Sequence, residues 1–142
     1  MFSLSSEPIL RDPLTASLAT GQAGALATFE GWVRNHNEGR EVVLLEYEAF
    51  EPLSRKEADK ILHEAGEKFN VLQVVCVHRV GALEVGDIAV WIGVTAEHRD
   101  AAFMACQYII DEVKVRLPIW KKEHYTDGSS EWVNCRECAH AR

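Results

Sequence analysis

Hydrophobic and polar residues alternate along several stretches of the chain, a pattern typical of β-strands with one buried face. In residues 42 to 50, one face is expected to be hydrophobic and the other acidic. The hydrophobic face holds Val43, Leu45, Tyr47 and Ala49, and the acidic face holds Glu46 and Glu48. Further strands are predicted at 24 to 33, 71 to 80, 87 to 95 and 119 to 125. Asparagine and glycine in 35 to 40 favour a turn, so the strands before and after it are predicted to pair as a hairpin.

Two other stretches repeat their hydrophobic residues every three or four positions, which predicts helices. The first starts at Pro52, a residue suited to a first helical turn. Its predicted buried residues are Leu53, Ala58, Ile61, Leu62, Ala65 and Phe69. The second starts between His98 and Asp100, with Asp100 as a candidate N-cap, and must end before Pro118. Its predicted hydrophobic stripe is Phe103, Cys106, Ile110, Val113 and Leu117.

The remaining segments are less strongly patterned. A short helix is predicted from Pro13 to about Ala19, and a turn at 81 to 86. From residue 42 the order of elements is β-α-β-β-α-β, preceded by one extra strand. This order predicts an α+β sandwich with a split β-α-β-β-α-β core. We expect a single domain over residues 1 to 142, with an N-terminal segment at 1 to 23 and a C-terminal tail at 126 to 142 anchored by Trp132.

Basic residues gather on both sides of Pro118, at Lys114, Arg116, Lys121 and Lys122. The chain has 15 basic and 22 acidic residues, a net charge of −7, so this local cluster predicts an anion site. Lys114 also fits the simpler role of stabilising the C-terminus of a helix. Lys121 and Lys122 should point to opposite faces of a strand, so that only one of them can readily join Lys114.

Three further residues are candidates for anion binding. His98 and Arg99 begin a helix, where unpaired backbone N–H groups favour anions. Arg34 lies where a strand enters a loop and could hold a phosphate through two hydrogen bonds. Each of the three also fits an ordinary solvated surface charge.

Composition and motifs exclude several classes of protein. The acidic net charge argues against nucleic-acid binding. The sequence has no signal-peptide pattern and no run approaching the roughly 20 apolar residues of a membrane span, so we expect a cytoplasmic protein with no membrane contact. Cysteines are then expected to be reduced. The Cys135-x-x-Cys138 pair near His140 lacks the second ligand pair of a structural zinc site, so no metal is expected. Hydrolase, NTPase and dinucleotide motifs are absent.

Five segments, in order, resemble the large, catalytic subunit of molybdopterin synthase. They are V-R-N-H-N at 33 to 37, L-E-Y-E-A at 45 to 49, H-R-V-G at 78 to 81, V-T-A-E-H-R at 94 to 99 and V-K-V-R-L-P-I-W-K-K-E at 113 to 123. The likeness covers about residues 20 to 133. It implies an α/β hammerhead fold and a sulfurtransferase that converts cyclic pyranopterin monophosphate into the molybdopterin dithiolene. Two sulfurs would come from the thiocarboxylated C-terminal Gly-Gly of a small ubiquitin-like subunit, and two large subunits would form a central dimer.

The resemblance also implies site residues. Lys114 and Lys121 match the family's two key lysines and are expected to be catalytic. The expected substrate contacts are Trp32, Val33, Arg34, His98, Arg99, Lys114, Lys121, Lys122 and Glu123. No cofactor is implied, and no cysteine nucleophile is needed because the sulfur is brought by the partner. The chain departs from the family at Glu131, before Trp132, where a basic residue is common.

The spacing of these residues raises a geometric problem. Arg99 and Lys114 are 15 residues apart, about 22 Å along a continuous helix, which is too far for one small pterin. We therefore expect each site to be shared between two subunits. Two other functions stay open from the residues alone: a lyase that forms a Schiff base on Lys114, and a non-catalytic anion-binding scaffold.

Overall fold

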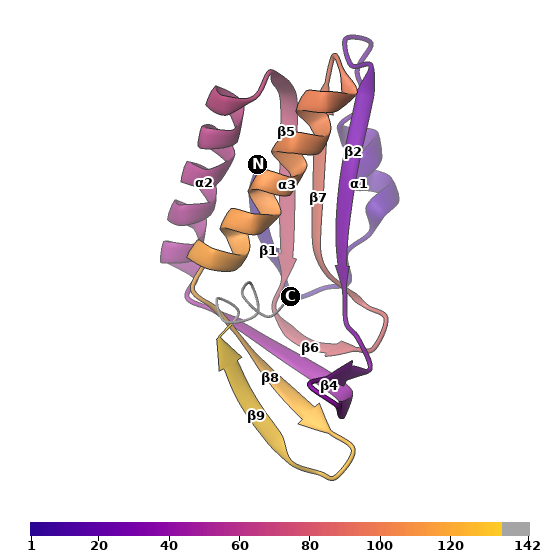
Figure 1. Ribbon diagram of the computed structural model, residues 1–142, viewed down its shortest axis with the longest axis vertical. Helices are drawn as coiled ribbons and strands as arrows, with labels where there is room; N and C mark the ends of the chain where they lie inside the picture. Colours follow the sequence, from indigo (N-terminus) through magenta and orange to yellow (C-terminus); the bar gives the residue numbers. More distant parts are fainter. Residues whose placement is uncertain (135–142) are drawn as a thin grey trace.

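The computed structural model describes residues 1–134, so Cys135, Cys138 and His140 lie outside the described residues. Its upper part is a four-stranded sheet in the order β1-β5-β7-β2 (Figure 1). These strands are β1 (Phe2–Ser5), β5 (Val71–Arg79), β7 (Ile88–Ala96) and β2 (Ala25–Trp32). The β1–β5 pair is parallel, and the β5–β7 and β7–β2 pairs are antiparallel. Helices α2 (Glu51–Lys68) and α3 (Arg99–Arg116) cover one face, and α1 (Arg11–Ser17) lies on the other.

A second sheet lies beyond the C-terminal end of α3 (Figure 1). Its order is β3-β4-β8-β9, and β6 pairs with β4 outside that path. The strands are β3 (His36–Asn37), β4 (Arg40–Ala49), β6 (Gly81–Glu84), β8 (Ile119–Tyr125) and β9 (Ser130–Asn134). The backbone N–H of Phe50, where β4 leads into α2, donates to the carbonyl of Pro118, where α3 leads into β8 (3.1 Å). This bond fixes both helix-to-strand connections at one place, so the end of α3 is held against the second sheet.

The predicted α+β class is confirmed. The four strands of the expected core are divided between the two sheets, with β5 and β7 in the first sheet and β4 and β8 in the second. The predicted hairpin between residues 24 to 33 and 42 to 50 is wrong, because β2 pairs with β7 while β4 pairs with β3, β6 and β8. A turn does form within residues 35 to 40, as predicted, but it joins β4 to the two-residue strand β3 and not to β2. Glu38 (φ 51°) and Gly39 (φ 77°) both have positive φ, as two-residue hairpin turns of the favoured twist require.

The buried faces differ from the predicted ones at single positions. Val43 is 49% exposed because a bulge between Val42 and Leu44 turns the strand there, so Val42 is buried instead. In α3 the buried residues include Ala102 and Ala105, and Phe103 is 64% exposed. In α2, Ser54 is buried in place of Leu53, and Trp132 is half exposed rather than a core anchor.

Helix α3 runs for 18 residues without interruption. Its N-cap is His98 in extended conformation rather than Asp100, with no side-chain capping bond. The helix ends at Arg116, as expected from Pro118. The short helix α1 is present but begins at Arg11, and the strands β1 and β6 were not predicted. In the described part of the chain, no helix is both long and apolar enough to cross a membrane.

Candidate active site

Lys114 lies in the last turns of α3, half-buried beside the core residues Val113 and Leu117. The positive charge of Lys114 is one cause of the lowered pKa of His78 in β5. The larger cause is burial, and together they lower the pKa of His78 to about 4. Its ring is therefore neutral near pH 7.

Lys121 reaches the same place from the second sheet. It lies opposite Tyr47 in the β4–β8 pairing, and directly opposite residues of an antiparallel pair share a face. Tyr47 is buried, and its ring meets that of His78 edge-on, with centroids 5.2 Å apart. Strand pairing therefore places Lys121 beside the buried Tyr47–His78 pair, and the charge of Lys114 contributes to the electrostatics of the same histidine. Among the described residues, neither lysine forms an ion pair.

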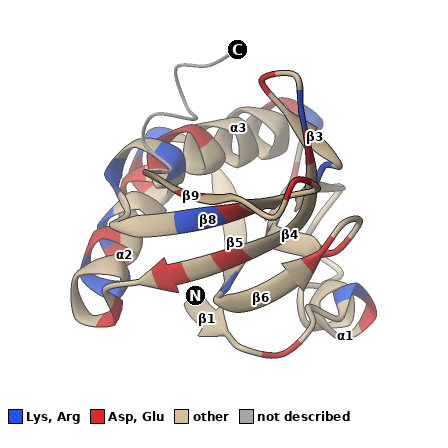
Figure 2. Ribbon diagram, turned by 90° about the horizontal axis from the view of Figure 1, so that it is seen from below, with Lys and Arg blue, Asp and Glu red and all other residues tan. Residues whose placement is uncertain are grey.

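Lys122 and Glu123 occupy different faces of β8. The ammonium of Lys122 lies 5.6 Å from the centre of the Trp132 ring on the outer face, as the alternation of a strand predicts. Glu123 is buried on the inner face, where it accepts hydrogen bonds from Asn37 Nδ2 (2.8 Å) and Tyr125 Oη (3.4 Å). Figure 2 shows the resulting blue and red segments of β8 beside the red segments of β4.

Arg116 does not join the lysines, although the sequence grouped it with them. Its guanidinium forms ion pairs with Glu64 (2.6 Å), Glu57 (3.4 Å) and Glu112 (3.4 Å). Glu64 also accepts a hydrogen bond from Tyr108 (2.7 Å). Arg116 therefore ties α3 to α2.

The segment from Trp32 to Arg34 leaves β2 at the end of the sheet nearer the second sheet (Figure 1). Trp32 is exposed, and its indole N–H donates to Glu30 (2.8 Å). Val33 is buried, and both its backbone groups are used, in bonds with Asp87 and Gly86. Its role would accordingly be to fix the position of the exposed Arg34.

His98 and Arg99 lie at the other end of the same sheet. Ala25 pairs with Ala96 there, whereas Trp32 pairs with Ile88 at the end where Arg34 follows. The uninterrupted α3 separates Arg99 from Lys114 by about 22 Å. One chain therefore gathers Lys114 and Lys121 but not His98 and Arg99.

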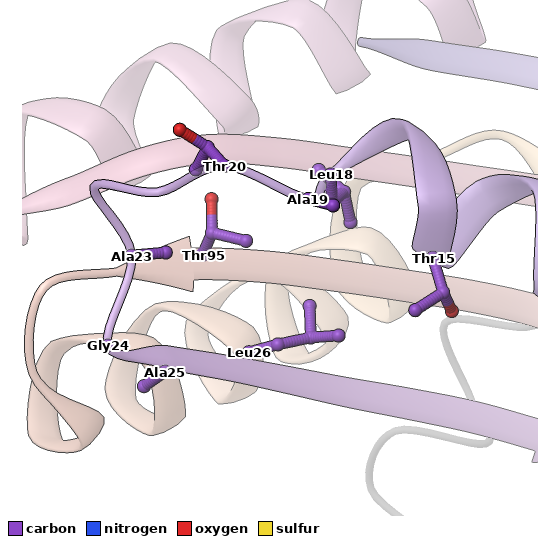
Figure 3. Close-up of a pocket in the computed structure, with 9 residues that line it drawn as sticks. All are labelled: Thr15, Leu18, Ala19, Thr20, Ala23, Gly24, Ala25, Leu26 and Thr95. Carbon is purple, nitrogen blue, oxygen red and sulfur yellow. The ribbon is translucent and has the colours of Figure 1, made fainter.

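A cavity of about 290 Å³ near the start of β2 is not suited to an anion. Figure 3 shows its lining of small, apolar and hydroxyl side chains, without a basic residue. Another hollow, of about 440 Å³, lies between β2 and α3 and is lined by residues that include Phe29, Phe103 and Ile110. Neither has the charge that a phosphate requires.

The described cysteines are unsuited to nucleophilic chemistry. Burial raises the pKa of Cys76 to about 12 and that of Cys106 to about 11, so both stay as thiols. Within residues 1–134, no group of three or more potential ligands could hold a metal ion. The Cys135–Cys138 prediction lies outside that range.

Sequence reasoning did not single out His78 and Tyr47 as site residues. It treated both as ordinary members of buried strand faces, although each falls within a segment that carried the family resemblance. The available signal was a histidine in an otherwise apolar strand, which has to be paired or neutral when buried.

Comparison with known proteins identifies the family. The model of the MoaE protein family matches residues 4–116. The molybdopterin synthase catalytic subunit of Synechococcus elongatus is 50% identical over 115 residues, covering 79% of this chain and 70% of the relative. The crystal structure of molybdopterin synthase from Staphylococcus aureus superposes with a TM-score of 0.85 at 37% identity, covering 92% of this chain and 94% of that chain.

A complex of subunits 1 and 2 of molybdopterin-converting factor from Helicobacter pylori shares the fold, with a TM-score of 0.76 at 20% identity and coverage of 96% and 90%. The family match begins within β1, includes β5, β7 and β2 of the four-stranded sheet, and ends at Arg116, the last residue of α3, so it stops before β8. The chain belongs to the MoaE family, whose relatives include molybdopterin synthase catalytic subunits from cyanobacteria to cattle.

Proposed function

We propose that this chain is the catalytic subunit of a molybdopterin synthase, a sulfurtransferase of molybdenum cofactor biosynthesis. It would take two sulfurs from the thiocarboxylated C-terminus of a small ubiquitin-like subunit and install them on cyclic pyranopterin monophosphate as a dithiolene. The observation that carries this proposal is that Lys121 lies beside the buried Tyr47–His78 pair, that the charge of Lys114 contributes to the pKa of the same histidine, and that neither lysine is paired to a carboxylate among the described residues. The family membership supports the choice of reaction.

The two lysines suit this chemistry for separate reasons. A phosphate needs fixed positive charge, and an ammonium supplies it without a fixed hydrogen-bond geometry. When the partner's thiocarboxylate sulfur bonds to a pterin carbon, an oxygen departs from that carbon and needs an acid, and a thioester forms between the partner and the pterin. Hydrolysis of this thioester leaves the sulfur on the pterin and needs a base for the attacking water. Two amines held near one another can divide these tasks. The sulfur nucleophile would come from the partner, which agrees with the buried, protonated thiols of Cys76 and Cys106.

The remaining substrate contacts are assigned by position. Arg34 would hold the phosphate from the end of β2, with Trp32 and Val33 shaping that segment. Glu123 would act from the inner face of β8 and Lys122 from its outer face. We expect the reaction to take place in the cytoplasm, where unpaired thiols such as these remain reduced.

We further propose that His98 and Arg99 complete the site of a second copy of the chain. Strand β2 is the end strand of its sheet, and the hollow beside it exposes Phe103 on α3. Two copies joined through this face by a two-fold axis perpendicular to α3 would run their α3 helices in opposite directions. The start of one α3 would then approach the end of the other, and two equivalent sites would result.

The proposal is tested by incubating the protein with thiocarboxylated small subunit and cyclic pyranopterin monophosphate. The expected product is the dithiolene, at two sulfurs per pterin. Borohydride added during turnover should trap no adduct on Lys114, whereas a Schiff-base lyase would be trapped. A protein that bound the pterin but formed no dithiolene would favour the anion-binding scaffold instead.

A further inference from the structure

Glu123 is a buried carboxylate that forms no ion pair with any of the described residues. It is 2% exposed on the inner face of β8, two residues beyond Lys121. Its Oε1 accepts hydrogen bonds from two neutral groups, the amide of Asn37 (2.8 Å) and the phenol of Tyr125 (3.4 Å). An apolar side chain would fill the same space without the need for polar partners. The carboxylate is therefore best explained by the groups that it holds.

The bond from Asn37 to Glu123 joins two strands that are not neighbours. The order β3-β4-β8 places β4 between them. Strand β3 has only two residues, and its ladder with β4 consists of two residue pairs. A hydrogen bond to a carboxylate is stronger than one between neutral groups. The side chain of Asn37 thus fastens the short strand β3 to β8 across the strand that separates them.

Tyr125 and Arg40 hold the acceptor in place from the other side. The guanidinium of Arg40 lies 3.5 Å from the centre of the Tyr125 ring and donates to Ser129 (2.7 Å). Burial and then the charge of Glu123 raise the pKa of Tyr125, so its phenol stays protonated and remains a donor. Glu123 is therefore a fixed point to which β3 is attached.

Arg34 lies between two anchored parts of the main chain. Val33, before it, uses both of its backbone groups in hydrogen bonds with the β6–β7 turn. The carbonyl of Asn35, after it, accepts from the N–H of Val42 in β4 (2.8 Å), and the bond from Asn37 follows two residues later. Arg34 itself is exposed and forms no ion pair within residues 1–134. Its backbone is fixed while its guanidinium stays available to an anion.

We infer that Asn37 is a positioning residue for Arg34: its hydrogen bond to Glu123 holds the segment that carries Arg34 in register with the strand that carries Lys121. A phosphate that contacts both cations needs a constant spacing between them. Asn37 has this effect without touching the substrate. The inference rests on the proposed function for the identity of the anion, but pterin binding and the hydrogen bond can both be measured without turnover.

The binding test compares two replacements of Asn37 by calorimetry with cyclic pyranopterin monophosphate. Asn37→Ala removes the donor and should raise Kd by about 10-fold, because a misplaced arginine loses part of its charge-assisted bonding to the phosphate. KM should rise similarly in turnover, with a smaller change in kcat, since this contact is made before and during the chemical step. Asn37→Gln keeps an amide donor and should recover part of the loss. The matched control is Glu41→Gln, at an exposed position of β4, which should leave Kd unchanged.

A double mutant tests whether Asn37 acts through Arg34. In an Arg34→Ala background, Asn37→Ala should cause little further rise in Kd. Independent, multiplicative rises would overturn the inference, because they would show that Asn37 only stabilises the second sheet.

The side-chain amide of Asn37 provides a readout in the wild-type protein, which needs neither substrate nor a variant. Its NMR signal should show one amide proton that exchanges slowly with solvent. Rapid exchange of both protons would refute the inference even if Asn37→Ala failed to fold. A wild type that bound the pterin but made no dithiolene would refute the proposed function alone, and the Kd comparison would still decide the inference. A wild type that did not bind the pterin would overturn both.

Discussion

Two groups of charge lie at the C-terminal end of α3, and they differ in what surrounds them. Arg116 is enclosed by three carboxylates from α2 and α3, at 2.6 to 3.4 Å. Lys114, two residues earlier, forms no ion pair with a described residue, and its charge contributes to the lowered pKa of the buried, neutral His78. The cation whose charge is matched by acids holds two helices together. The cation whose charge is unmatched is available to an anionic substrate.

The sequence shows only four basic residues around one proline, so this difference depends on the fold. Carboxylates at 57 and 64 are far from Arg116 in the chain and reach it only because α2 packs beside α3. Substitutions at the two cations should therefore have opposite consequences, one for turnover and the other for stability.

The largest effect is expected from Lys114→Ala. Removing this amine should lower the single-turnover rate of dithiolene formation by at least about 100-fold, because an acid–base group and a phosphate contact are lost together. The melting temperature should change little, since Lys114 forms no ion pair with a described residue. A variant that folded and kept a near-wild-type rate would remove Lys114 from the active site.

Lys121 and Lys122 provide a matched pair on one strand. Lys121→Ala should lose most activity, because its side chain shares the inner face with Tyr47. Lys122→Ala should lose less, because its side chain lies over Trp132 on the outer face. Single-turnover rates at saturating small subunit compare the two, and equal losses would contradict the assignment of faces to function.

The other end of α3 is tested by mixing two inactive proteins. If each site uses Lys114 of one subunit and Arg99 of the other, a mixed dimer of Lys114→Ala and Arg99→Ala has one intact site. Half of randomly mixed dimers are of this kind, so about a quarter of wild-type activity should return. No recovery, once subunit exchange is confirmed by mass spectrometry, would rule out the shared site.

The smallest effect on activity is expected from Arg116→Ala. This variant should keep its single-turnover rate and melt several degrees lower, because Glu57 and Glu64 lose their ion pairs with Arg116, which join α2 to α3. The control is Arg55→Ala, which removes an exposed pair with Glu51 on α2 and should barely change the melting temperature.

The ion pair also predicts how stability depends on pH. Hydrogen bonds from Arg116 and Tyr108 lower the pKa of Glu64 from 4.5 to about 2. A lowered pKa stabilises the folded protein above the unfolded value, so this contribution should fade as the pH falls from about 4.5 towards 2. Melting curves of wild type and Glu64→Gln should converge over that range. Curves that stayed parallel would show that the pair contributes no stability.

Much of the fold could be predicted from local pattern. The alternation of hydrophobic and polar residues located most strands, and hydrophobic residues at helical spacing located the two long helices. The position of Pro118 correctly predicted the end of α3. Strand pairing could not be predicted in the same way. The segment from 24 to 33 has two nearby candidates for pairing, and it binds β7 rather than β4 because the β3–β4 turn takes up the adjacent residues. Hydrophobic spacing also placed Phe103 in the predicted stripe of α3, whereas its side chain is exposed and lies outside the core of this chain.

The candidate site was predictable as a set of cations but not as a geometry. The resemblance supplied Lys114 and Lys121, and strand alternation separated Lys121 from Lys122. The surroundings of His78 and Arg116 could not be predicted, because they depend on the packing of elements that are distant in the sequence. Tyr47 of β4 contacts His78, and carboxylates of α2 pair with Arg116. A buried neutral histidine and a paired arginine have no distinctive local spacing.

The uninterrupted course of α3 makes helical phase a determinant of activity. One residue inserted in its middle would turn Lys114 by about 100° relative to Arg99. Seven inserted residues would add almost two whole turns and restore the facing of Lys114, while moving the two ends about 10 Å further apart. If both ends of the helix serve sites in different subunits, even this phase-preserving insertion should inactivate the enzyme. The length of α3 would then be constrained as strictly as the residues at its ends.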